Sequence, residues 1–192
     1  MKRQALAGQA VLCSGLSGAL GTIRAVMASD VLREKVYSAE KQVWSALNRV
    51  GQVSMVDFFG SELALQPEKR FATIAEIETY ASDVIAQWNR HYSTKISNVA
   101  VRRRKGEERA HYEFDTKTIA IPTATGWALR ELVCLHEISH HLTFIYHPKA
   151  AHHGPEFAGM YIEVVRLIMG DEVALLLRAA FDGVGVIVGQ FA

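Results

Sequence analysis

The sequence predicts a single α+β domain from about residue 28 to residue 192, and three observations predict it. Apolar residues recur at helical spacing in several long segments. Short strand-like runs, separated by turn residues, lie between those segments. The composition is that of an ordinary globular chain, with 49% hydrophobic residues, 21% charged residues and a formal net charge of +1. The net charge is close to zero and therefore does not indicate binding to nucleic acid or to a membrane surface.

Residues 1–27 are predicted to be an N-terminal extension, either weakly structured or read from a start codon placed too early. Lys2 and Arg3 precede a mildly apolar stretch rich in Ala, Gly and Ser, which loosely resembles a secretory signal. Polar residues dilute that stretch, so export is the minority interpretation. Two cysteines, Cys13 and Cys134, are too few for a disulfide framework and favour a reducing compartment. We therefore expect a cytoplasmic protein without membrane contact.

The first half of the domain is predicted to hold two helices with strands between them. Residues 30–50 carry apolar side chains at helical spacing, with a polar opposite face. Residues 52–65 have the character of one or two short strands. Thr73 and Glu76 have the spacing of a capping box, so a second amphipathic helix is expected to begin there.

The second half is predicted to begin with strands and to continue with helices. Three strand-like runs have the spacing of an antiparallel meander: 99–101, 110–114 and 118–121. Three helices are expected after them: 127–144, 155–169 and 171–182. Pro155 suits the first position of the second of these helices, where a missing backbone N–H costs nothing.

The chemistry is concentrated in the predicted helix over residues 127–144. His136 and His140 lie four positions apart, so they project from one helix face and can reach one metal ion together. Glu137 points about 100° away around the helix axis, where it can hydrogen-bond a water on that ion. This is the pattern of a zinc hydrolase, in which the metal lowers the pKa of the water and the glutamate accepts the proton. Burying this set in an apolar helix without a metal would be costly.

A third protein ligand is needed if one coordination position is to stay open for water. The candidates are His141, His147, His152, His153, Glu156 and Glu163. His141 faces away from the shared ligand face, and His147 and His152 are most simply interpreted as exposed loop histidines. His153 is favoured for two reasons. The segment between His140 and His153 is long enough for the chain to reverse its direction, and Gly154-Pro155 fixes the start of the next helix. Glu156 or Glu163 as the third ligand would give two histidines and a carboxylate instead of three histidines.

These motifs carry a resemblance to a known family. His136-Glu137-x-x-His140, followed by His153-Gly154-Pro155-Glu156-Phe157, resembles the SprT-like zincins, including the Spartan DNA–protein-crosslink proteases. From about residue 32 onward the chain is also similar to a bacterial family of small HExxH metallohydrolases. That similarity involves Val36–Glu40, Phe71, Val101–Arg104, Ala110–Tyr112 and Trp127–Leu132. Residues 1–27 lie outside it.

The resemblance implies a zincin-like fold, a minimal metalloprotease domain with a small antiparallel sheet packed on the HExxH helix. It implies zinc as the cofactor, His136, His140 and His153 as its ligands, and Glu137 as the catalytic residue. It supplies no substrate. The chain has no CxxC pair of the kind that accompanies many SprT-like proteases, which counts against a DNA-repair role.

The predicted function is therefore a zinc-dependent metallohydrolase, a peptidase that cleaves an amide bond in an unidentified peptide or protein. The alternative is a non-catalytic protein with a zinc site, which contacts nucleic acid through a basic hairpin at residues 102–109. Glu137 favours the enzyme, because a structural zinc site usually has four protein ligands and needs no such carboxylate. Tyr112, Tyr146 and Tyr161 are candidate donors to an oxyanion, although core-edge packing is the simpler interpretation.

Overall fold

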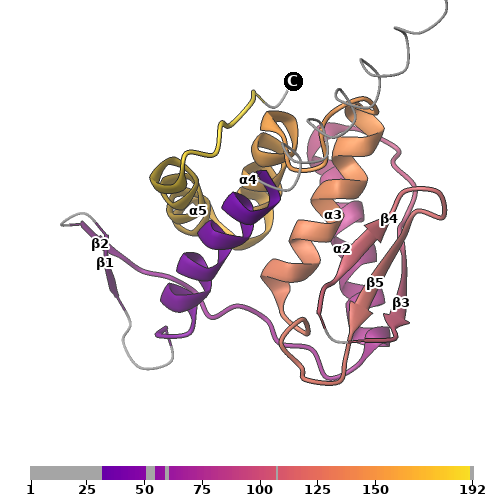
Figure 1. The fold of residues 1–192 in the computed structure, drawn as a ribbon, viewed down its shortest axis with the longest axis horizontal. Helices are drawn as coiled ribbons and strands as arrows, with labels where there is room; N and C mark the ends of the chain where they lie inside the picture. Colours follow the sequence, from indigo (N-terminus) through magenta and orange to yellow (C-terminus); the bar gives the residue numbers. More distant parts are fainter. Residues whose placement is uncertain (1–31, 51–54, 59–60, 107, 191–192) are drawn as a thin grey trace, which may run out of the picture.

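The computed structural model describes residues 32–50, 55–58, 61–106 and 108–190. The extension predicted for residues 1–27 lies outside these ranges. A helix over residues 32–47, which we call helix 32–47, comes first. The elements after it are β1 (Val56–Phe58), β2 (Ser61–Leu63), α2 (Ile74–Tyr92), β3 (Ala100–Arg104), β4 (His111–Glu113), β5 (Thr118–Pro122), α3 (Glu131–Tyr146), α4 (Pro155–Met169) and α5 (Asp171–Val184). The α+β class is confirmed (Figure 1).

Local sequence signals mark the starts of two helices, α2 and α4. Thr73 Oγ1 accepts a hydrogen bond from the backbone N–H of Glu76 at 3.2 Å, and Glu76 accepts one from Ala72 at 2.9 Å. This is the predicted capping box at the start of α2. Helix α4 begins at Pro155, as predicted. Helix α3 begins at Glu131 rather than near residue 127, because Arg130 has an extended backbone and forms an isolated bridge with Arg70.

The three-stranded sheet differs from the predicted antiparallel meander. Its order is β3-β5-β4, with β3 parallel to β5 and β4 antiparallel to β5. All five residues of β5 are buried, as expected for a strand with neighbours on both edges. The chain turns tightly from β4 into β5, and the segment after β3 passes to the far edge of β5. The prediction of a wholly antiparallel sheet was therefore wrong.

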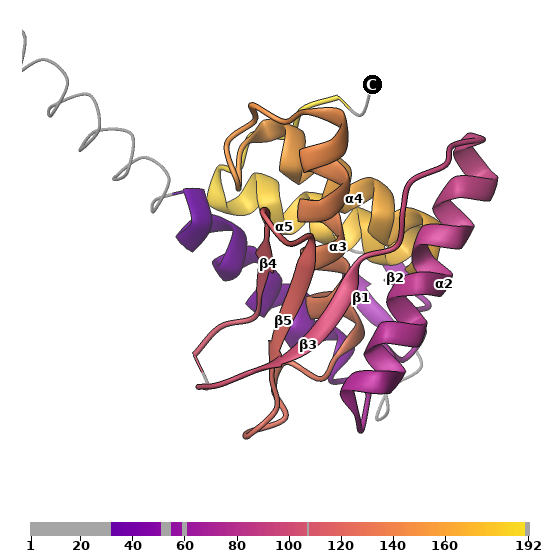
Figure 2. The ribbon, with the colours of Figure 1, turned by 90° about the vertical axis from the view of Figure 1, so that its right-hand side faces the viewer.

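Helix α3 lies at the centre of the molecule. It contacts β4 and α2 on one side and α4 on the other, and α4 packs on α5 (Figures 1 and 2). All its residues from Glu131 to Thr143 are buried. The largest fully buried side chains around it are Trp88, Tyr161, Phe157 and Phe181. Among the described helices, none is long and apolar enough to cross a membrane.

Candidate metal centre

Three buried histidines converge on one point. His136 and His140 come from successive turns of α3, and His153 comes from the loop just before α4. The Nε2 atom of His136 lies 3.1 Å from that of His140 and 3.3 Å from that of His153. Nitrogen ligands of a tetrahedral zinc ion lie roughly 3.3 Å apart, given Zn–N distances of about 2.0–2.1 Å. The residues predicted as metal ligands are thus brought together with suitable spacing.

The loop that carries His153 is held by close packing at its end. The N–H of Gly154 donates to the carbonyl oxygen of Ala151 at 3.0 Å, and Gly154 then accepts the first hydrogen bond of α4 from Ala158. A Cβ atom on Gly154 would lie only 3.1 Å from the Cβ of Ala151. Glycine therefore lets the loop close tightly before Pro155 starts the helix.

A carboxylate from a distant helix orients His136. Glu40, on helix 32–47, accepts a hydrogen bond on Oε1 from Nδ1 of His136 at 2.7 Å. The Tyr161 hydroxyl donates to the same oxygen at 2.8 Å. A proton held on Nδ1 leaves the lone pair of Nε2 free for a metal. Burial alone would lower the pKa of His136, but the charge of Glu40 and its hydrogen bond raise it above its ordinary value.

The other two histidines are held in the neutral form. Burial lowers the pKa of His153 to about 2, and the nearby His136 acts in the same direction. Burial also lowers the pKa of His140 well below its ordinary value. A neutral imidazole is the form that binds a metal, so the surroundings prepare both side chains as ligands.

Glu137 lies beside the three histidines and is buried. The nearby backbone of Tyr112, in the edge strand β4, favours its ionised form. Its Oε2 atom is buried and has no hydrogen-bond partner among the described residues. Burial raises the pKa of Glu137 to about 7. A buried carboxylate with one unpartnered oxygen is suited to accept a proton from water.

The remaining candidate ligands lie outside the three-histidine cluster. His141 points to the other side of α3, where its Nδ1 lies 2.9 Å from the Tyr112 hydroxyl and its Nε2 3.1 Å from the Ser97 carbonyl oxygen. His152 packs edge-on against Phe114. Glu163 is bonded to Arg166. Two further candidates also lie outside the cluster: His147 and Glu156.

The tyrosines considered as oxyanion donors are engaged elsewhere. The Tyr112 hydroxyl is bonded to His141, that of Tyr146 accepts from Trp88 at 3.2 Å, and that of Tyr161 donates to Glu40. A further tyrosine, which the sequence analysis did not consider as a donor, lies beside the histidines. The ring of Tyr37 lies 5.7 Å, between centroids, from the rings of both His136 and His153.

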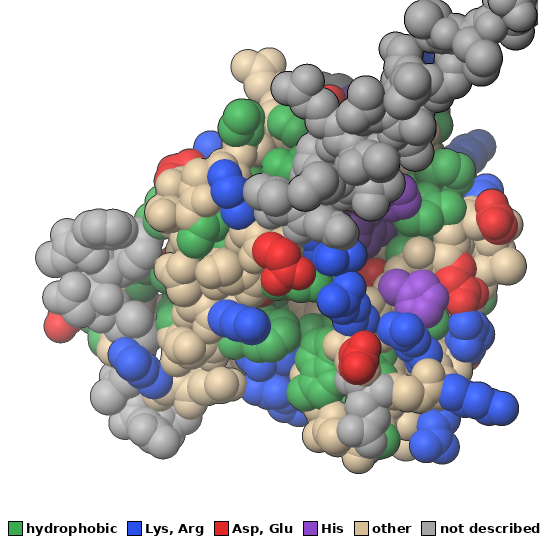
Figure 3. All heavy atoms as spheres, in the orientation of Figure 1, with side chains coloured by type: hydrophobic (Ala, Val, Ile, Leu, Met, Phe, Trp, Pro, Cys, Tyr) green, Lys and Arg blue, Asp and Glu red, His purple; other side chains and the backbone are tan. Residues whose placement is uncertain are grey.

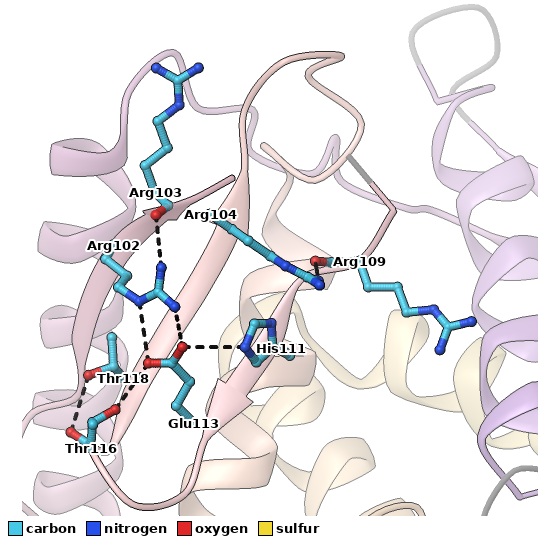
Figure 4. A network of polar contacts seen from close by, with 8 residues as sticks. All are labelled: Arg102, Arg103, Arg104, Arg109, His111, Glu113, Thr116 and Thr118. Atoms are coloured by element: carbon cyan, nitrogen blue, oxygen red, sulfur yellow. Dashed lines mark hydrogen bonds and ion pairs between the residues drawn. The ribbon is translucent and has the colours of Figure 1, made fainter. Parts of the chain in front are cut away.

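The basic segment over residues 102–109 is not a hairpin, since its strand β3 and the following β4 lie on opposite edges of β5. Arg102 forms an ion pair with Glu113, which also lies 3.4 Å from Nε2 of His111 (Figure 4). Arg104 donates a hydrogen bond to the carbonyl oxygen of Arg109. Two of the five cations in this segment are thus engaged in local contacts.

Comparisons of the chain with protein-family models, with curated proteins and with solved structures give no match. The resemblance to SprT-like zincins consequently stays a prediction from the motif residues.

Proposed function

We propose that this chain is a zinc-dependent hydrolase that cleaves an amide bond, with Glu137 as the general base. The observation that carries the proposal is the convergence of three histidine Nε2 atoms beside a buried carboxylate whose Oε2 has no partner among the described residues. Three histidine nitrogen donors and one position left open form the ligand set of a catalytic zinc site. A bound zinc ion would supply a Lewis acid that polarises a carbonyl and lowers the pKa of a water molecule.

The role of Glu137 follows from its surroundings. Burial raises the pKa of Glu137 above its ordinary value, which makes its carboxylate a stronger base. The backbone of Tyr112, in strand β4, which pairs with β5, lies close enough to favour the ionised carboxylate. We infer that Glu137 takes the proton of the attacking water and passes it to the leaving amine.

The alternative, a non-catalytic zinc protein that contacts nucleic acid, has less support. Structural zinc sites usually have four protein ligands, whereas the cluster among the described residues has three. A nucleic-acid contact also needs guanidinium groups that are available to phosphates. Within the basic segment, Arg102 and Arg104 are already engaged by Glu113 and by the backbone of Arg109, which leaves fewer cations for such a contact.

The test combines metal analysis with a nearly isosteric substitution. Purified protein should contain close to one zinc per chain, and Glu137→Gln should keep zinc and fold. Against a peptide that the wild type cleaves, Glu137→Gln should lose on the order of 10²–10⁴ in rate. His136→Ala should lose both metal and activity. Glu156→Gln, outside the cluster, is the matched control and should behave as wild type. Full activity of Glu137→Gln, or protein that takes up no zinc, would contradict the proposal.

A further inference from the structure

A groove crosses the proposed metal site. Two cavities, of about 300 Å³ and about 290 Å³, lie on either side of Glu137 and share four lining residues. The shared residues are Tyr37, Arg109, Ala110 and Glu137. His136 lines the first cavity, whereas His140 and His153 line the second. The cavities are therefore two compartments of one groove, and a substrate bond at Glu137 would have groups on both sides.

The first compartment has aromatic walls. Trp44, on helix 32–47, and Trp127, just before α3, pack together as one aromatic wall of this compartment, with ring centroids 6.3 Å apart and planes inclined by 42°. Val133 and Ala110 add apolar surface. The guanidinium of Arg130 lies 4.5 Å from the ring centre of Trp44 and supports that indole. Half-buried aromatic rings beside a reacting centre favour an apolar group of the substrate.

The second compartment is cationic. Arg33, Arg104 and Arg109 line it together with histidines, and Glu137 is the one carboxylate among its described lining residues. On this face, Lys and Arg side chains gather between helix 32–47 and the sheet, beside histidine side chains (Figure 3). The Arg109 side chain extends toward helix 32–47, away from the Arg102–Glu113 pair (Figure 4). Its guanidinium makes no ion pair with a described carboxylate, so it is available to an anionic group.

Resting on the proposed function, we propose that the groove takes an acidic amide substrate: an apolar, preferably aromatic group packs against the wall formed by Trp44 and Trp127, and a carboxylate pairs with Arg109. The scissile amide then lies over Glu137, between the two compartments. The substrate class is that of short peptides or N-acyl amino acids that carry an aromatic group on one side of the bond and a carboxylate on the other. The walls recognise the first group by burial of apolar surface and the second by charge.

The test measures binding of three hydroxamates to the zinc-loaded protein by titration calorimetry. Acetohydroxamate reports metal binding alone, 3-phenylpropanohydroxamate adds an aromatic group, and succinic monohydroxamate adds a carboxylate. The aromatic probe should bind on the order of tenfold tighter than acetohydroxamate, from apolar burial. The anionic probe should bind about three- to tenfold tighter, and its advantage should shrink at high salt because the arginine is exposed.

Substitutions separate the two compartments. Trp127→Ala should abolish the advantage of the aromatic probe alone, and Trp127→Phe should keep most of it. Arg109→Gln should abolish the advantage of the anionic probe alone, while Arg103→Gln, which points away in Figure 4, serves as its control. The inference is overturned if acetohydroxamate binds but neither larger probe binds more tightly than it does. It is also overturned if each variant lowers the affinity for all three probes equally. In both cases the metal site stands. If no hydroxamate binds the zinc-treated protein, the proposed function fails and this inference fails with it.

Discussion

The carboxylate of Glu40 accepts a hydrogen bond from Nδ1 of His136 at 2.7 Å, although the two residues lie 96 positions apart in the chain. The contact joins helix 32–47 to α3 inside the core, where both side chains are almost fully buried. Because Glu40 decides which imidazole nitrogen carries the proton, it is a positioning residue for the proposed ligand. Helix 32–47 therefore belongs to the site as well as to the core.

Glu40→Gln should weaken zinc binding. The amide carries no charge to hold the proton on Nδ1, and loss of a partner behind a histidine ligand typically costs about 10- to 100-fold in metal affinity. Competition with a chromophoric chelator measures this affinity directly. Glu34→Gln, on the exposed side of the same helix, is the matched control. Equal zinc affinities for the two variants would show that Glu40 does not position His136.

His153→Ala should lose stoichiometric zinc, because it removes one of three converging nitrogens. His152→Ala changes the neighbouring residue, whose ring packs on Phe114 outside the cluster, and should retain the metal. Zinc per chain after dialysis distinguishes the two variants. If His153→Ala kept its zinc and His152→Ala lost it, His152 rather than His153 would be the third ligand.

The ion pair between Glu163 and Arg166 should make the stability of the fold depend on pH. Burial alone would raise the pKa of Glu163, but hydrogen bonds from Arg166 and Tyr92 hold it below its ordinary value. A lowered folded-state pKa contributes stability above the unfolded value of about 4.3, and this contribution is lost as pH falls through the folded-state pKa. Glu163→Gln should therefore be less stable than wild type at neutral pH, and the gap should close on acidification.

Denaturant unfolding of wild type and Glu163→Gln, both with zinc chelated, measures that gap from about pH 7 to about pH 3.5. Chelation removes the separate effect of acid on the histidine ligands. A difference in unfolding free energy that stays constant across this range would mean that the charge of Glu163 does not stabilise the fold.

A chain shortened to begin at Met27 should fold with an unfolding free energy within about 1 kcal/mol of the full chain. Residues 1–27 have no periodic core pattern, and the buried core of the described residues begins at Val36. Thermal and denaturant unfolding of the two chains provide the comparison. A loss of several kcal/mol would show that the extension packs into the core.

The parts of the fold that local signals determine could be predicted from the sequence. Thr73 with Glu76 marked the start of α2, and Pro155 marked that of α4. The strand order could not be predicted in this way, because spacing along 97–121 is compatible with β4 or β5 at the centre. Burial of β5 on both faces decides the order, and burial is a property of the whole molecule.

The same distinction applies to the site. His136, Glu137 and His140 follow from helix periodicity within one segment, and His153 from the turn that precedes Pro155. Tyr37 and Glu40 lie on one face of a distant helix, and nothing in their local sequence says that this helix crosses α3. Their place beside the histidines depends on tertiary packing, which the spacing of residues does not encode.

The complete burial of α3 from Glu131 to Thr143 has a consequence for how the site can be lost. A segment buried in this way is protected from solvent, so its backbone amides should exchange with deuterium mainly when the whole domain opens. Zinc would add its binding free energy to the closed state alone. Zinc bound as proposed should therefore slow deuterium exchange in this segment, so that its amides would report whether the site is loaded.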